Sequence, residues 1–114
     1  MNFDITATPD FRKSLKALAK KYRSIKSDFK QFSESLRANP FQGTELTPGI
    51  RKIRMAIESK NRGKSGGARV ITYTVLASEI EGHIYLLDIY DKSEFTSIDV
   101  KILQEKVKEI ITVR

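Results

Sequence analysis

Apolar and charged residues alternate in the middle of the chain. Ile53 and Met55 occupy every second position, and Lys52 and Arg54 occupy the positions between them. A period of two is typical of a β-strand that buries one face, because successive side chains point to opposite sides. We therefore predict a strand over 51–56 that turns Lys52 and Arg54 toward the same open face.

A turn and a second strand follow. Residues 61–67 include three glycines, which is typical of a flexible turn. Arg69 then opens a run over 69–77 that is rich in β-forming residues. A hairpin of the two strands would bring Arg69 near Lys52 and Arg54. These cations could be a basic edge that keeps a strand soluble, but we favour a surface that binds a polyanion, because one hairpin gathers all three.

The N-terminal third has the spacing of an amphipathic helix. Residues 2–7 alternate as a short strand, and Thr8 and Pro9 form a helix-start signal, because Thr caps a first turn and Pro suits its first position. One stripe follows at helical spacing: Phe11, Leu15, Leu18 and Tyr22. The opposite side carries five cations, which we interpret as a solvated face: Arg12, Lys13, Lys16, Lys20 and Lys21.

A second helix is predicted from Ser24, which can cap it, to Asn39, which precedes a proline and so avoids helical angles. Its buried stripe consists of Ile25, Phe29, Phe32 and Leu36. The two helices should form an antiparallel hairpin that covers one face of the sheet. We predict turns at 41–43 and 47–49, which lead into the basic strand.

The C-terminal third predicts one more strand and one more helix. Residues 83–90 form an apolar strand that ends at 91–94, and Thr96 and Asp99 have the spacing of a capping box. The last helix has one apolar side: Val100, Leu103, Val107, Ile110 and Ile111. The order is βααβββα, so we predict one α+β domain over 1–114 with a mostly antiparallel sheet.

Charge and composition narrow the class of partner. The 114 residues carry a net charge of +7, and residues 51–69 hold seven basic residues against one acid. Charge this concentrated should attract nucleic acid. The chain has no cysteine, no apolar run of the roughly 20 residues that span a membrane, and a polar start. We therefore expect a cytoplasmic protein without a membrane partner.

The available side chains also narrow the chemistry. His83 is the single histidine, which we interpret as structural, and no carboxylate cluster suits a metal. Arginine fits phosphate oxygens, and cations stabilise a pentavalent phosphorane. Tyr90 and Tyr73 could stack on a base or transfer a proton, although Tyr73 could equally be a core ring.

RNA can supply its own nucleophile, because the ribose 2′-OH can attack the adjacent phosphate. The protein must then supply a general base, and a lysine crowded by other cations becomes a candidate. From the residues alone, a metal-independent ribonuclease and a passive RNA-binding module both remain open.

Four segments stand in one order along the chain: LxxNPxxG (36–43), RKIRMA (51–56), GKSGGARVITY (63–73) and YLLDIYDKSE (85–94). Together they resemble the RelE/ParE toxin superfamily, and within it the HigB-like and RelE-like proteins. The resemblance implies the toxin of a type II toxin–antitoxin pair, with a RelE-like sheet packed by helices and no cofactor. The partners it implies are a cognate antitoxin, which we expect to be of the helix-turn-helix type, the ribosome with mRNA, and operator DNA bound as a toxin–antitoxin complex.

The resemblance assigns catalytic roles to five residues. Lys52, Arg54 and Arg69 would bind the scissile phosphate, with Lys52 the better candidate for the base, and Tyr90 and Lys92 would complete the site at the end of the last strand. We predict further RNA contacts from Arg51, Lys60, Arg62, Lys64 and Tyr73.

The chain departs from the RelE pattern at two places. Ser93 stands where RelE has an arginine, and no tyrosine follows Tyr90, whereas RelE has one near its C-terminus. The general acid and base are therefore not transferred, and Tyr90, Lys92 and Lys64 are the candidates to replace them.

The function we predict is that of a ribosome-dependent mRNA endonuclease, an mRNA interferase. Two alternatives stay open at this stage. One is a ParE-like inhibitor of DNA gyrase that binds without catalysis, and the other is an inactive relative that binds RNA or the antitoxin.

Overall fold

The computed structural model describes the backbone of residues 2–60, 66–94 and 99–113, and the side chains of these ranges up to residue 110. The elements are β1 (Asn2–Ala7), α1 (Pro9–Lys21), α2 (Ile25–Ala38), β2 (Thr44–Thr47), β3 (Ile50–Met55), the 3-10 turn η1 (Glu58–Lys60), β4 (Ala68–Leu76), β5 (Glu81–Asp91) and α3 (Val100–Val113).

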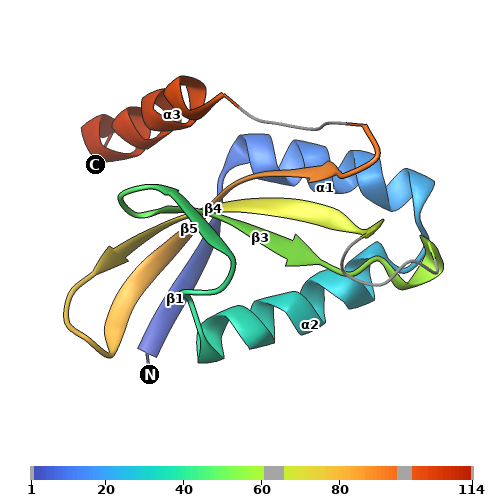
Figure 1. Ribbon diagram of the computed structural model, residues 1–114, viewed down its shortest axis with the longest axis horizontal. Coiled ribbons are helices and arrows are strands. Elements are labelled where there is room, and N and C mark those ends of the chain that lie inside the picture. Colours follow the sequence, from blue (N-terminus) through green and yellow to red (C-terminus); the bar gives the residue numbers. More distant parts are fainter. Residues whose placement is uncertain (1, 61–65, 95–98, 114) are drawn as a thin grey trace.

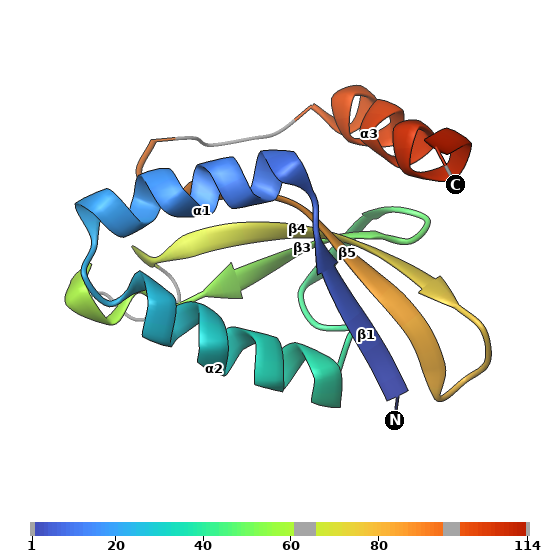
Figure 2. The same cartoon turned by 180° about the vertical axis from the view of Figure 1, so that it is seen from behind.

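The five strands form one mixed sheet in the order β1-β5-β4-β3-β2. Within the described residues, β1 pairs with β5 in parallel, and the other three pairs are antiparallel. The predicted α+β class is confirmed, as are the helical hairpin and the C-terminal helix. Helices α1 and α2 run alongside the sheet and meet at one end of it (Figure 2), whereas α3 lies near the start of α1 (Figure 1) and is joined to it by the ion pair of Lys106 with Asp10.

The predicted element order is wrong by one strand. Residues 44–47, where no strand was predicted, form the edge strand β2, which pairs with β3 through Thr44 opposite Lys52 and Glu45 opposite Arg51. A turn at Gly49, whose φ is +83°, reverses the chain between the two strands. Four mostly polar residues at a sheet edge show no buried face, so their pattern could not indicate a strand.

The helix starts are partly as predicted. The Thr8 hydroxyl accepts a hydrogen bond from the Phe11 amide, which confirms this cap. Ser24 occupies the position before α2 but donates its hydroxyl to the Asp28 carboxylate instead of capping. Helix α3 begins at Val100, with Asp99 accepting from the Lys101 amide, so Asp99 is its cap, and Thr96 lies outside the described residues.

Two apolar clusters cover the two faces of the sheet unequally. The larger joins both helices of the hairpin to one face and includes Phe11, Leu18, Ile25, Phe32, Leu36, Ile53, Met55, Val70, Ile84, Leu86 and Ile89. The smaller joins Leu103 of α3 to the other face and includes Ile50, Ile71, Leu87 and Tyr90. Because α3 contributes few residues, this second face is covered only in part, and its remainder is available for a site.

A buried carboxylate ties the elements together where β5 ends. Asp91 is 1% exposed and accepts hydrogen bonds from the Lys60 ammonium at 2.8 Å, the Tyr22 hydroxyl, and the Ser93 amide and hydroxyl. Burial by itself would raise the pKa of Asp91, but these hydrogen bonds outweigh it and hold the pKa well below its ordinary value. Asp91 thus connects α1, η1 and the segment after β5.

In the ranges the structure describes, every helix is too short or too polar to cross a membrane.

We predict that Asp91→Asn lowers the free energy of unfolding by about 3 kcal/mol at neutral pH, because it leaves the Lys60 ammonium, on a side chain 10% exposed, without its counter-charge. The pKa of Asp91 is lowered by folding, so its contribution is complete above the unfolded pKa of about 3.9 and is lost as pH falls below it. The difference between wild type and variant should therefore shrink in acid.

Urea unfolding at several pH values measures this difference. Asp4→Asn is the matched control, because Asp4 is exposed, and it should change stability by less than about 0.5 kcal/mol. A difference for Asp91→Asn that stays constant from neutral pH into acid would contradict the assignment.

Candidate functional site

Three side chains stand in one row across the partly covered face of the sheet. In the strand register, Arg54 of β3 lies opposite Arg69 of β4, and Arg69 lies opposite Tyr90 of β5. Directly opposite residues of antiparallel strands point to the same side. The row therefore presents two guanidinium groups and one phenol together.

The alternation of each strand explains why these side chains face this way. Ile53 and Met55 of β3 are both 2% exposed in the larger cluster, so the residues between and before them, Arg54 and Lys52, must face the other side. In β4, Ala68 and Val70 belong to the larger cluster as well, and the residue between them is Arg69. The predicted strand and the convergence of its cations with Arg69 are confirmed.

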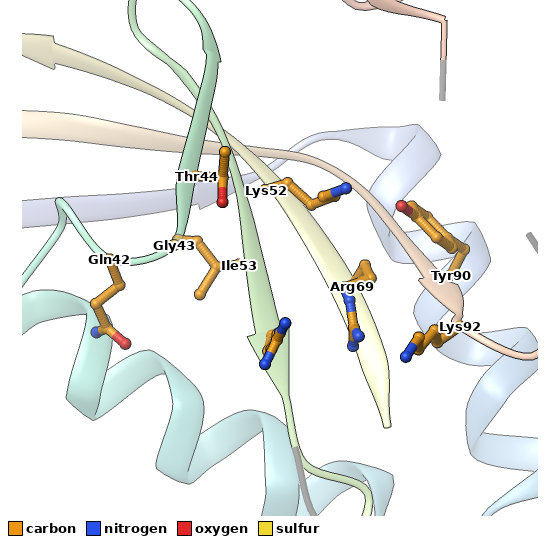
Figure 3. A pocket seen from close by; sticks show the side chains of 9 residues that line it. Gln42, Gly43, Thr44, Lys52, Ile53, Arg69, Tyr90 and Lys92 are labelled. Atoms are coloured by element: carbon orange, nitrogen blue, oxygen red, sulfur yellow. The ribbon is translucent and has the colours of Figure 1, made fainter. Parts of the chain in front are cut away.

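Two lysines flank the row. Lys52 lies two residues from Arg54 along β3, or about 7 Å, and Lys92 follows β5 with its amide bonded to the Gly67 carbonyl at 3.1 Å. Figure 3 shows the ends of Lys52 and Tyr90 turned toward each other across β4, while Lys92 points toward Arg69. The structure thus brings together the five residues that were predicted as catalytic.

These residues line a cavity of about 650 Å³. One side consists of Lys52, Arg54, Arg69, Tyr90 and Lys92, and the other consists of Gln42, Gly43 and Thr44. A cavity of this size can hold a small molecule or a nucleotide rather than a single ion. It combines a strongly positive wall with a neutral, polar one.

Arg69 is held in an unfavourable position. It is 6% exposed and lies directly opposite another arginine, an arrangement of like charges that destabilises a sheet. Burial lowers the pKa of Arg69, and Arg54 lowers it further, while Tyr90 acts in the opposite direction. One guanidinium nitrogen donates to the Ala68 carbonyl at 3.1 Å, which restrains the side chain. An anion in the cavity would relieve this repulsion.

Tyr90 adds a phenol to the lining of the cavity. Burial raises the pKa of its phenol, the Asp88 carboxylate raises it further, and Arg69 opposes the shift only in part. The phenol therefore keeps its proton at neutral pH. Beside two arginines, it can donate a hydrogen bond or a proton to a phosphate oxygen.

Arg51, predicted as an RNA contact, lies on the opposite side of β3 from Lys52. Its guanidinium donates to the Phe41 carbonyl at 3.0 Å and the Gln42 carbonyl at 3.4 Å, and it lies 5.7 Å from the centre of the Phe41 ring. Strand alternation turns Arg51 away from the cavity and into a clamp on residues 41–42, so it is not one of the residues that line the cavity.

Lys60 and Tyr73 are also placed elsewhere. Lys60 is bonded to the buried Asp91, so its ammonium is committed to the interior rather than to solvent. Tyr73 lies four residues along β4 from Arg69, about 13 Å away, where it stacks with Tyr85 beside the smaller apolar cluster. Neither residue lines the cavity. Arg62 and Lys64 lie outside the described residues, so their assignments stay predictions.

Sequence reasoning missed the neutral wall of the cavity. Gln42, Gly43 and Thr44 line it, yet the pattern indicated only a turn. A signal was present in Gly43, whose φ is +76°, since a backbone in the left-handed region favours glycine. His83, interpreted as structural, bonds to the Thr6 hydroxyl at 2.6 Å, away from the cavity.

No protein-family model matches the chain. In the described part of the structure, no three His, Cys, Asp or Glu side chains are grouped so that they could hold a metal. What the cavity offers is two permanently charged arginines, two lysines and one phenol. Such a set can bind a phosphate, stabilise added negative charge on it, and donate one proton.

We predict that phosphate stabilises the protein through the arginine row. At ten times its dissociation constant, an anion that binds only the folded state adds about 1.4 kcal/mol, or roughly 5 °C in Tm for a chain of this size. Arg54→Gln should slightly raise the Tm without phosphate, because it removes the like-charge pair, and should abolish most of the phosphate response.

Thermal unfolding against phosphate concentration at constant ionic strength tests this. Arg12→Gln is the matched control, because Arg12 is exposed on α1, and it should keep the full response. Equal responses in wild type, Arg54→Gln and Arg12→Gln would show that the row is not an anion site.

Proposed function

We propose that the protein is a metal-independent endoribonuclease that cuts mRNA on the ribosome and acts as the toxin of a type II toxin–antitoxin pair of the RelE/ParE superfamily. The observation that carries the proposal is the row of Arg54, Arg69 and Tyr90, directly opposite one another on three strands. Two convergent cations and a protonated phenol suit the transition state of phosphate-ester cleavage.

The chemistry follows from this arrangement. The scissile phosphate binds to Arg54 and Arg69, which stabilise its additional negative charge as the ribose 2′-oxygen attacks phosphorus. A base removes the 2′-OH proton, and Lys52 is the candidate because it stands beside the row. The bond from phosphorus to the 5′-oxygen breaks, and the leaving oxygen takes a proton from Tyr90. The products are a 2′,3′-cyclic phosphate and a 5′-hydroxyl.

The departure at Ser93 has a structural consequence. Both the Ser93 amide and its hydroxyl bond to Asp91, so this residue anchors the segment after β5 and does not replace an arginine at the phosphate. Lys92, which lines the cavity, takes the place of that positive charge. The C-terminal tyrosine of RelE, proposed there as a base, has no counterpart in this chain, and Tyr90 takes the acid role.

Dependence on the ribosome and neutralisation by an antitoxin rest on the four-segment resemblance. The ribosome would present one mRNA codon to the cavity, and the net charge of +7 favours association with ribosomal RNA. The same proposal places the protein in the cytoplasm, with a helix-turn-helix antitoxin that binds operator DNA together with the toxin.

We predict that Arg69→Ala abolishes toxicity and lowers the cleavage rate by roughly 10²–10³-fold, the usual cost of one donor to a developing anion. Circular dichroism should show an intact fold, because the substitution removes a buried charge. The measurement maps RNA ends on mRNA-programmed ribosomes, with a ribosome-free arm in EDTA. Cuts confined to one codon position are expected.

Three results would redirect the proposal. A folded Arg69→Ala variant that is as toxic as wild type would refute the nuclease assignment. Growth arrest with intact mRNA and DNA-damage signalling would instead identify a gyrase inhibitor, and harmless expression of folded wild-type protein would identify an inactive relative.

We predict that Tyr90→Phe lowers the cleavage rate by roughly 10²–10⁴-fold, the usual contribution of a general acid. RNA binding should change little, because phenylalanine preserves the ring in the smaller cluster. Single-turnover rates and the affinity for a non-cleavable 2′-deoxy substrate separate the two effects. Tyr85→Phe is the control, since Tyr85 lies beside Tyr73 at the other end of the sheet. An unchanged rate for Tyr90→Phe would exclude Tyr90 as the acid.

A further inference from the structure

Side-chain hydrogen bonds hold the neutral wall of the cavity at residues 41–42. The two carbonyls before it, those of Phe41 and Gln42, both accept hydrogen bonds from the Arg51 guanidinium. The Gln42 side-chain nitrogen donates to the Ser35 carbonyl, the Ser35 hydroxyl and the Asn39 carbonyl, at 2.9–3.0 Å. These contacts hold residues 41–42 against β3 and the end of α2.

Gly43 allows the wall to lie close against β3. Its φ is +76°, and a Cβ atom there would be 2.2 Å from the Lys52 carbonyl oxygen. No side chain can therefore be accommodated without a shift of the backbone, so Gly43 packs directly against the backbone of β3. The Gln42 amide nitrogen is directed to α2, so it does not block the cavity.

Thr44 places a neutral hydroxyl at a definite distance from the cations. It lies opposite Lys52 in the β2–β3 register, so both side chains point to the same side. Arg69 lies two strands away from Thr44 and two residues further along, which is about 10 Å across the sheet and about 7 Å along it. A phosphate bound at Arg69 would leave the space toward Thr44 to the group attached to that phosphate.

We infer that residues Gln42–Thr44 form a nucleoside subsite, which takes the sugar and base attached to the phosphate that the arginine row binds. The Thr44 hydroxyl and the backbone of Gly43 supply its hydrogen bonds. Arg51 is a positioning residue, which holds the wall without touching the nucleotide. The inference rests on the proposed function in one respect, that the ligand's phosphate belongs to RNA.

The inference explains two features that phosphate binding alone does not. The cavity of about 650 Å³ is far larger than a phosphate needs. In addition, Arg51 of the basic strand binds two backbone carbonyls rather than facing the cavity. A wall of neutral donors and acceptors is suited to the polar edges of a base or to a ribose hydroxyl, which is how proteins recognise single-stranded RNA.

The test is an NMR titration of the wild-type protein with inorganic phosphate, ribose 5-phosphate and the four nucleoside 5′-monophosphates. Phosphate should shift the amides of Arg69, Tyr90 and Lys92. The nucleoside monophosphates should shift these and also the amides of Gly43 and Thr44, and at least one should bind roughly three- to tenfold tighter than ribose 5-phosphate, as one or two hydrogen bonds predict.

Two variants and their controls separate recognition from folding. Thr44→Val should remove the preference for nucleotides over ribose 5-phosphate while leaving the phosphate affinity unchanged, and Thr44→Ser should retain it. Arg51→Ala should lower the affinity for nucleotides to that for ribose 5-phosphate without lowering the affinity for inorganic phosphate. Arg23→Ala is its matched control, because Arg23 is an exposed arginine on the link between α1 and α2. It should change neither the nucleotide affinity nor the phosphate affinity.

Each outcome decides the inference. Nucleotides that shift only the amides that phosphate shifts, or that bind no tighter than ribose 5-phosphate, would overturn the subsite even if the protein cuts mRNA. Shifts at Gly43 and Thr44 from a protein that cuts no RNA would keep the subsite and refute the nuclease. Equal losses of phosphate and nucleotide affinity in Arg51→Ala would show that Arg51 supports the whole cavity and not the wall.

Discussion

The site depends on two arginines that face each other across neighbouring strands. Arg54 and Arg69 repel each other across the strand pair, and Arg69 also loses most of its contact with water. Such a pair persists only where the surrounding structure imposes it, and here the register between β3 and β4 does so. That register in turn is set by the apolar residues on the opposite side of both strands. The larger core therefore stabilises an arrangement that the smaller face by itself would not form.

The unequal cover of the two faces determines where the site lies. Leu103 of α3 closes the smaller cluster, and Lys106 ties the helix to Asp10 at 3.1 Å and approaches Asp88 to 3.9 Å. Beyond the reach of α3, the same face carries the cations. Tyr90 belongs to both regions, since it is 9% exposed within the cluster and also lines the cavity. This boundary position accounts for its raised pKa, because the cluster removes water from a phenol that still reaches the cavity.

Cations of one short stretch have quite different roles. Arg54 faces the cavity, Arg51 clamps a loop, and Lys60 neutralises a buried carboxylate. The last role matters for the site, since Asp91 lies between Tyr90 and Lys92 in the chain and anchors the segment that follows β5. A net charge summed over the stretch would suggest one continuous binding surface. The structure instead divides the charge between binding, support and internal neutralisation.

The sequence by itself determined the features that repeat within one element. The alternation of Ile53 and Met55 with Lys52 and Arg54, and the helical stripes of α1 and α2, follow from local geometry and can be recognised from spacing alone. The tertiary structure alone decided which distant groups meet. Lys60 pairs with Asp91 across 31 positions, Arg51 reaches the carbonyl of Phe41, and β2 exists because β3 offers it an edge. These contacts depend on how the strands and loops are arranged in space, and that arrangement leaves no periodic pattern in the sequence.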